Sequence, residues 1–247
     1  GISLHDRLVA YLPRYAPWAS RFSVLANLRN SVPGLAKLLE KPTGFTATRD
    51  LPRWSSNPFK DAEVAADPAP QAVLFADSFN RNFQPENLRA TVNVLNAAKV
   101  QFAVASAPKG ERPLCCGRTF LSAGLVDEAK TEAQRLVRAL MPYVEQGLPV
   151  IGLEPSCLLT LRDEIPGLLP GKEAERLAEK AMMLEEYIAV QADNPDFELP
   201  LKSPAKKVLL HGHCHQKALG VMSSIEKTLS QFPDTEVEVV ETSCCGM

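Results

Sequence analysis

The triplet Cys-Cys-Gly occurs twice in this chain, as Cys115-Cys116-Gly117 and as Cys244-Cys245-Gly246. Adjacent cysteines make poor disulfide partners for each other, because their Cβ atoms rarely reach disulfide geometry. They are well suited to act as paired soft ligands for iron, iron–sulfur clusters or zinc. A single Cys-Cys pair is more often two small residues packed beneath a sheet, but two pairs that each end in glycine favour a metal or cluster site.

The other two cysteines also lie in distinctive surroundings. Cys157 ends the motif Glu154-Pro155-Ser156-Cys157, and Cys214 lies within His211-Gly212-His213-Cys214-His215. Each precedes a segment of helical character, and a helix N-terminus favours the thiolate, which is the form that binds iron or zinc. The plainer interpretation of Glu154 is a solvated residue in the first turn of a helix.

Three histidines within five residues surround Cys214. If this segment continues a strand, then His211, His213 and His215 share one face opposite Cys214, because side chains alternate along a strand. A Cys/His group combined with Cys-Cys elsewhere is compatible with tetrahedral zinc. Isolated histidines more often cap a helix, but three so close together favour ligands or residues that orient ligands.

The composition is that of an ordinary soluble globular protein, with 45% apolar and 23% charged residues and a formal net charge of −2 over 247 residues. Lysines and arginines are scattered along the sequence, which predicts neither nucleic acid nor an anionic membrane as a partner. No apolar run approaches the roughly 18 residues that cross a bilayer, and the N-terminus lacks the pattern of a signal peptide. Six cysteines are too few for a disulfide-stapled scaffold of this length, so we expect reduced thiols and a cytoplasmic location.

Residues 1–70 differ from the rest of the chain and hold both tryptophans and eight of the 20 prolines. We predict short helices at about 20–30 and 33–40, because prolines interrupt anything longer, and extended chain from 41 to 70. We interpret this segment as a proline-rich, partly helical N-terminal arm that wraps the following domain or connects it to something upstream.

From residue 71 onward, short apolar runs alternate with segments of helical periodicity. This alternation predicts parallel strands joined by right-handed crossovers, an α/β architecture of Rossmann-like units. The order strand, helix, strand, Cys-Cys-Gly appears twice, so we predict a duplicated parallel-sheet unit, with copies at 71–170 and 171–247 related by a pseudo-twofold axis. All six cysteines then lie at or just beyond the carboxyl ends of strands, where sheets of this class gather function. The predicted strands are 72–76, 100–105, 149–153, 207–211 and 237–240, and the predicted helices are 87–99, 118–123, 126–146, 172–190 and 216–229.

Four motifs together resemble the cysteine-rich (CCG) domain, and the resemblance covers about residue 71 to the end of the chain. The version that the chain resembles most is found at the C-terminal end of large flavin-linked oxidases that carry an iron–sulfur module, such as bacterial D-lactate and D-2-hydroxyglutarate dehydrogenase-like proteins. The motifs are Leu114-Cys115-Cys116-Gly117-Arg118, Gly152-Leu153-Glu154-Pro155-Ser156-Cys157, His211-Gly212-His213-Cys214-His215-Gln216-Lys217 and Ser243-Cys244-Cys245-Gly246-Met247.

The resemblance implies an iron–sulfur site. A related domain in heterodisulfide reductase uses more cysteines, and Asp77 and Glu154 stand here where two of them would lie. We therefore expect one shared cluster of the 4Fe-4S type, which four thiolates suffice to hold, and we expect it to be lost at least in part during aerobic purification. Gly117 and Gly246 would let the backbone approach the cluster and donate N–H bonds to it. The expected ligands are Cys115, Cys116, Cys157, Cys214, Cys244 and Cys245, and the residues expected around the cluster are Gly117, Arg118, Glu154, His213, His215 and Gly246.

The resemblance further implies the electron-transfer module of a FAD-linked 2-hydroxy-acid oxidoreductase. A flavin on an upstream domain would accept hydride equivalents from the substrate, and the cluster would pass electrons singly to an acceptor. The chain has no flavin fingerprint of its own, so we do not expect it to oxidise substrate alone. The expected partners are upstream flavin and ferredoxin-like domains or subunits, and the expected location is cytoplasmic, extending to a peripheral position at the inner membrane face.

Two other functions are compatible with the cysteines: a zinc-stabilised structural or docking domain, and a thiol–disulfide redox site at one Cys-Cys pair. The chain ends one residue after the second triplet, whereas proteins of the resembled family continue. We therefore expect the second unit to be truncated at its C-terminus.

Overall fold

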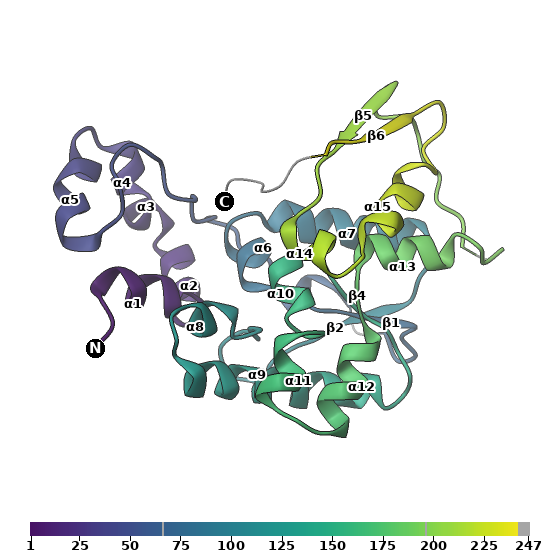
Figure 1. Cartoon of the computed structure of the whole chain (residues 1–247), viewed down its shortest axis with the longest axis horizontal. Helices are drawn as coiled ribbons and strands as arrows, with labels where there is room; N and C mark the ends of the chain where they lie inside the picture. The colour runs from purple at the N-terminus through teal and green to yellow at the C-terminus, as the bar shows by residue number, and fades with distance from the viewer. Residues whose placement is uncertain (66, 196, 242–247) are drawn as a thin grey trace.

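The computed structural model describes residues 1–65, 67–195 and 197–241, and its centre is a four-stranded parallel sheet (Figure 1). The strand order is β2-β1-β3-β4, so β1 lies between β2 and β3. Val73 of β1 pairs with Ala103 on one side and with Val150 on the other. This sheet confirms the predicted α/β class with parallel strands. The strands are β1 (Ala72–Leu74), β2 (Phe102–Val104), β3 (Val150–Gly152) and β4 (Ala181–Met183).

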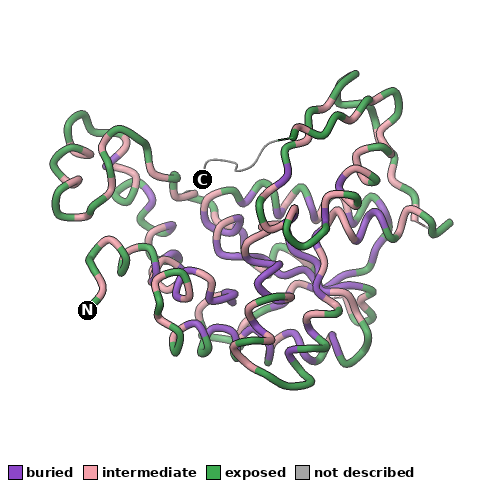
Figure 2. The backbone as a smooth tube through the Cα atoms, in the orientation of Figure 1, coloured by how far each residue is buried: buried purple, intermediate pink, exposed green. Residues whose placement is uncertain are grey.

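Helices cover both faces of this sheet, as a parallel sheet requires. Alternate residues of β1 point to opposite faces. Val73 belongs to the core that contains α9 (Val126–Val144), and Leu74 belongs to the core that contains α7 (Pro85–Ala97). These two helices correspond to the predicted ones. Figure 2 shows that the buried parts of the chain concentrate around the sheet.

The helix predicted over 172–190 is wrong as a single element. The structure instead has α12 (Lys172–Lys180), then β4, then α13 (Leu184–Gln191). The apolar residues of this segment fit a helical period, but pairing of β4 with β3 would be lost in a continuous helix. Arg162 supports the break, because its Nε donates a hydrogen bond to the carbonyl of Ala181 at 2.7 Å. Long-range pairing overrides the local pattern here.

The second predicted unit contributes a separate two-stranded parallel sheet of β5 and β6. Two helices, α14 and α15, lie between these strands, where the sequence predicts one helix over 216–229. Gly220, with a φ of 72°, takes the left-handed conformation that ends α14. The pseudo-twofold axis and the unit boundary at residue 170 stay predictions, and the second triplet lies outside the described residues. The bounds are β5 (Lys207–Leu210), α14 (Cys214–Ala218), α15 (Met222–Leu229) and β6 (Glu236–Val239).

The N-terminal arm holds five short helices followed by a largely extended stretch. Its first two helices pack on the sheet domain, with α1 against α8 and α2 against α6. Thr119 Oγ1 donates a hydrogen bond to the carbonyl of Ala10 at 2.8 Å, and Ser20 Oγ donates to Asn82 Oδ1 at 3.0 Å. Helices α3 to α5 lie further from the sheet (Figure 1). The arm helices are α1 (Leu4–Ala10), α2 (Leu12–Arg21), α3 (Ser23–Ala26), α4 (Leu28–Ser31) and α5 (Leu35–Thr43), with a 3-10 turn η1 (Asp61–Glu63) in the extended stretch.

The sequence prediction captured the later arm helices and missed the first two. Helix α2 begins where none was predicted, because Pro13 falls in its first turn, a position that tolerates proline. In the part of the chain that the structure describes, no helix has the length and apolarity needed to cross a membrane. The remaining helices are α6 (Ser78–Asn82), α8 (Arg118–Ser122), α10 (Pro155–Leu159) and α11 (Glu164–Leu168).

Two glycines share one backbone conformation but differ in their surroundings. Gly117 precedes α8 with a φ of 84°, and a Cβ there would lie 2.8 Å from the carbonyl oxygen of Ala129. Gly147 follows α9 with a φ of 83°, and no atom lies within 4 Å of its Cβ position. Comparing Gly117 with Gly147 therefore separates two contributions to the free energy of unfolding: the left-handed backbone and the close approach of a neighbouring atom.

We predict that Gly147→Ala lowers the free energy of unfolding by about 1 kcal/mol, the cost of the left-handed conformation alone. Gly117→Ala is expected to cost on the order of 2–4 kcal/mol, because α9 must also move away from the new methyl group. Urea unfolding followed by circular dichroism measures both. Equal losses would contradict the close packing of Gly117 on Ala129.

Candidate metal centre

Three parallel strands end at one edge of the sheet, and the segments that follow them bring cysteines and carboxylates together. Asp77 follows β1, the pair Cys115 and Cys116 follows β2, and Cys157 lies in α10 after β3. Neighbouring parallel strands share their carboxyl edge, which explains why residues distant in sequence meet there. Cys115 is 4% exposed, and Cys116 and Cys157 are each 2% exposed.

The three buried thiols form a continuous row. Cys116 lies between the other two in this row, because it interacts with both Cys115 and Cys157. Other groups point hydrogen atoms at the sulfurs: Gly117 N lies 3.4 Å from Cys115 Sγ, and the backbone N–H of Arg118 donates to Cys116. Hydrogen bonds of this kind favour negative charge on sulfur.

Two carboxylates flank the row and act as helix caps. Asp77 caps α6, where its Oδ1 accepts from the backbone N–H groups of Phe79 and Asn80, both at 2.9 Å, and its Oδ2 accepts from Asn80 Nδ2 at 2.7 Å. Glu154 caps α10, where its Oε2 accepts from the backbone N–H of Cys157 at 2.6 Å. Burial raises the pKa of Asp77 above its usual value, and the charge of Glu154 adds to this effect against the hydrogen bonds from Asn80.

The sequence predicts that helix N-termini favour the thiolate at these cysteines, but neighbouring groups and burial outweigh that effect on the pKa of the three buried thiols. The interaction with Cys116 and burial raise the pKa of Cys115 well above its usual value. The interaction of Cys157 with Cys116 lowers its pKa, but burial and the negative charges of Asp77 and Glu154 outweigh it and raise the pKa strongly. The helices α8 and α10 have only five residues each, so their dipoles are small.

These residues fit an iron–sulfur cluster in their chemistry. The row offers soft sulfur ligands and backbone N–H donors in a buried setting, and carboxylates lie beside it. A cationic centre would reverse the pKa rise, because metal binding stabilises thiolate and releases protons. The side chain of Arg118, expected near the cluster, forms an ion pair with Glu164.

His213, Cys214 and His215 form the start of α14, which contacts α10. The predicted strand geometry is wrong, because β5 ends at Leu210 and His213 is instead the cap of α14. His213 Nδ1 accepts from the backbone N–H of His215 at 3.2 Å, and the two rings stack with centroids 5.2 Å apart. Cys214 is exposed, in contrast to the buried row.

His213 lies close enough to Glu154 for their charges to interact. Burial lowers the pKa of His213, the charge of Glu154 raises it, and the net direction is downward. The Nδ1 atom of His215 is buried and has no hydrogen-bond partner among the described residues. This end of α14 therefore borders the same edge of the sheet as Glu154.

The structure brings Cys115, Cys116 and Cys157 together with Glu154. Cys244, Cys245 and Gly246 lie outside the described residues, so the shared site stays a prediction. Within residues 1–65, 67–195 and 197–241, no three His, Cys, Asp or Glu side chains form a group that holds a metal ion. A centre at the thiol row therefore needs further ligands or a cluster that spans it.

Sequence reasoning named Asp77 only as a departure from the cysteine pattern of a related domain, and it did not consider Ser78. Both residues interact with thiols of the row, Asp77 through its charge with Cys157 and Ser78 with Cys115. The signal was present, because an aspartate between a strand and a helix is a typical N-cap. The cap fixes Asp77 at the same edge as the cysteines.

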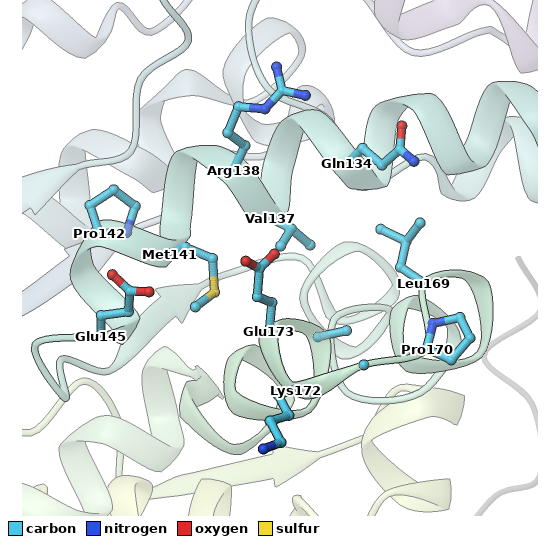
Figure 3. Close-up of a pocket in the computed structure, with 12 residues that line it drawn as sticks. Gln134, Val137, Arg138, Met141, Pro142, Glu145, Leu169, Pro170, Lys172 and Glu173 are labelled. Carbon is cyan, nitrogen blue, oxygen red and sulfur yellow. The ribbon is translucent and has the colours of Figure 1, made fainter.

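A groove of about 800 Å³ lies elsewhere, between α9 and the start of α12 (Figure 3). Arg138 and Gln134 of α9 and Lys172 and Glu173 of α12 line it. Its lining, as far as the structure describes it, includes none of the predicted site residues. The thiol row is enclosed by packing, which suits an inorganic centre better than an organic substrate.

We predict that metal-free, reduced protein at neutral pH reacts with iodoacetamide at Cys214 at least tenfold faster than at Cys115, Cys116 or Cys157, because buried thiols react only from locally open states and only as thiolates. Quantitative mass spectrometry of the peptides measures each cysteine separately. In denaturant the four rates should converge. Native labelling of Cys157 as fast as Cys214 would contradict the buried row.

Comparison with known proteins finds relatives at low identity. The chain is 26% identical over 251 residues to one of the subunits of the anaerobic glycerol-3-phosphate dehydrogenase of Escherichia coli K12, an alignment that covers 99% of this chain and 62% of that protein. It is 28% identical over 183 residues to lactate utilization protein A of Bacillus velezensis and 27% identical to that of Bacillus subtilis, covering 70% of this chain and 71% of each relative.

The chain thus spans about three-fifths of the length of the first of these relatives. No protein-family profile matches the chain. No solved structure matches it significantly. The similarity is therefore to individual proteins over part of their length. One is named as a subunit of a dehydrogenase, and the other is named for its part in the use of lactate.

Proposed function

We propose that this chain is an iron–sulfur electron-transfer subunit of a dehydrogenase system, a protein of the CCG type. The observation that carries the proposal is the row of three buried, mutually interacting thiols at the carboxyl edge of the sheet. Packing alone gives no reason for it, since valine or alanine fills such space without risk of oxidation. Similarity to a dehydrogenase subunit over 99% of the chain supports the same class of function.

Cys115, Cys116 and Cys157 would hold the cluster, together with cysteines from the set of Cys214, Cys244 and Cys245. A cluster supplies single-electron transfer at a potential that hydrogen bonds and burial adjust. The chain's own contribution is to exclude water from the sulfurs and to donate N–H bonds to them. Asp77 is a poor candidate ligand, because both of its oxygens already accept hydrogen bonds as a helix cap. We retain a single 4Fe-4S cluster as the proposed type.

We further propose that the chain acts with a FAD-containing partner that oxidises a 2-hydroxy acid. The name of the lactate relatives supports this substrate class, since lactate is a 2-hydroxy acid. The name of the dehydrogenase relative instead favours glycerol 3-phosphate. In either case the flavin would reside on an upstream domain or partner subunit, and electrons would leave this chain for an acceptor.

The two alternatives differ from the proposal in what they require of the cysteines. A zinc-stabilised domain uses the same kinds of ligand as the proposed cluster, so the metal content of the purified protein distinguishes the two. A thiol–disulfide site requires a thiolate nucleophile, but the pKa values of Cys115 and Cys116 are raised well above the usual value. For Cys115 the largest cause is its interaction with Cys116. Electron transfer through a bound cluster does not require a thiolate before the metal binds.

We predict that anaerobic reconstitution of the reduced protein with iron and sulfide produces broad visible absorption and bound iron. Cys116→Ser should abolish both, because Cys116 is the middle member of the row, while leaving the circular dichroism nearly unchanged. Glu154→Gln and His213→Ala should weaken iron binding by roughly 10- to 100-fold, as expected of residues that orient ligands.

Ala133→Ser is the matched control, because Ala133 is fully buried in the same core as Cys116 and the change adds a hydroxyl without removing a thiol. This variant should bind iron as the wild type does. Wild-type iron binding by Cys116→Ser would return the cysteines to a packing role. A colourless protein that retains zinc in place of iron would favour the docking domain.

We also propose a peripheral location at the inner face of the cytoplasmic membrane, mediated by the N-terminal arm. Residues 1–57 contain eight lysines and arginines but only three acidic residues, an excess that the charge of the whole chain conceals. The arm exposes large apolar side chains on α2, α3 and α5, among them Trp18, Val24, Leu25 and Leu38. Apolar side chains beside positive charge suit the interface of an anionic bilayer.

We predict that the protein sediments with vesicles of phosphatidylethanolamine and phosphatidylglycerol at low salt. Replacing both Val24 and Leu25 by serine should weaken binding by about tenfold, through lost apolar burial. Leu209→Ser is the control, because Leu209 is 62% exposed on β5, outside the arm. Equal effects of the two changes, or no binding by the wild type, would exclude the arm as a membrane contact.

A further inference from the structure

A buried carboxylate outside the thiol row, Glu132 of α9, joins three segments of the protein. Its side chain is 0% exposed and pairs with Arg112 in the loop before the cysteines, with Arg14 of α2 and with Arg135 of its own helix. The distance from Glu132 to Arg135 Nη1 is 2.8 Å, and that to Arg14 Nε is 3.4 Å. The arginine side chains are partly exposed and the carboxylate is not, and burying a charge is costly, but such a group can serve to fix one geometry. The proposed function gives Glu132 no role.

The segment that carries the cysteine pair depends on such contacts. Residues 105–117 connect β2 to α8 without forming a helix or a strand. Arg112 lies three residues before Cys115 and is bound to α9 twice. Its guanidinium pairs with Glu132, and its carbonyl accepts a hydrogen bond from Arg135 Nη2 at 2.7 Å. The side chains of α9 therefore fix the approach to the pair.

The other side of the pair is held by the same helix. Gly117 packs so closely on Ala129 that a Cβ would lie 2.8 Å from the carbonyl oxygen of Ala129. Ala129 and Glu132 are three residues apart, so they lie on one face of α9. Cys115 and Cys116 are thus held between two contacts that one turn of α9 provides.

We propose that Glu132 positions the Cys115–Cys116 pair by holding Arg112. Glu132 is a positioning residue and not a ligand, since its oxygens are occupied by arginines. Arg14 extends the same contact to the N-terminal arm, so the arm and the cysteine loop share one buried anchor. The inference rests on the proposed function in one respect, namely that Cys115 and Cys116 are ligands of the cluster.

The test measures the alkylation rate of each cysteine in metal-free protein, by mass spectrometry under native conditions. Glu132→Gln keeps the size of the side chain but removes the charge that holds Arg112. We expect Cys115 and Cys116 to react about tenfold faster than in the wild type, because the loop opens more often. Cys157 should be accelerated less than the pair, because its own backbone belongs to α10 and only its contact with Cys116 is lost.

Glu128→Gln is the matched control. Glu128 lies one turn earlier on α9 and pairs with Arg14, and its side chain is 35% exposed. This change should leave the labelling of the pair at the wild-type rate. Arg112→Gln should also accelerate the labelling of the pair, and the double variant should react no faster than Glu132→Gln alone, because Glu132→Gln already breaks the contact with Arg112.

The pattern of rates separates positioning from general destabilisation. Equal acceleration of Cys115, Cys116 and Cys157 would show only a loosened core and would overturn the proposal, as would unchanged rates in both variants. If Glu132→Gln fails to fold, Arg112→Gln alone decides by the same criterion. The iron content of the reconstituted wild type is measured separately. Absence of iron would overturn the proposed function, whereas the labelling rates would still test whether Glu132 positions the cysteine pair.

Discussion

The candidate centre depends on the pairing of β1 with β2 on one side and with β3 on the other. This pairing continues to the carboxyl edge, where Ala105 N donates to the carbonyl of Leu74 at 2.9 Å and Phe75 N donates to that of Ile151 at 2.8 Å. Parallel alignment places the ends of all three strands at one edge, and the thiols follow from there. Without β1 between them, β2 and β3 would not end side by side, and the cysteines that follow them would not meet.

Enclosing three thiols and a carboxylate at this edge has an energetic cost, which helix caps partly offset. Asp77 and Glu154 satisfy the first N–H groups of α6 and α10, so each carboxylate that raises the pKa of Cys157 also stabilises a helix. The same charges would favour a cationic centre in contact with the sulfurs. Local folding and the chemistry of the site are therefore served by the same residues.

Helix α9 connects the stability of the domain with the geometry of the cysteines. Leu136 and Leu140 are fully buried in the core beneath the sheet. Towards the start of the same helix, Ala129 and Glu132 contact the cysteine loop, and Glu132 also reaches the N-terminal arm through Arg14. A displacement of this helix would reach the core, the loop and the arm together, because a close-packed interior transmits such shifts.

The sequence by itself determined the α/β class, the order of the main strands and helices, and the position of the cysteines after strand ends, because hydrophobic period and local residue chemistry encode these features. Burial and long-range contact decided the rest. Pairing with β3 converts residues 181–183 into a strand inside a helical pattern. Desolvation raises the pKa of Cys157, which its place at a helix start would lower. Glu132 is an ordinary helix residue in the sequence, and only the folded chain brings three arginines to it. The exclusion of water and the approach of distant segments depend on tertiary structure, so a local sequence pattern does not predict them.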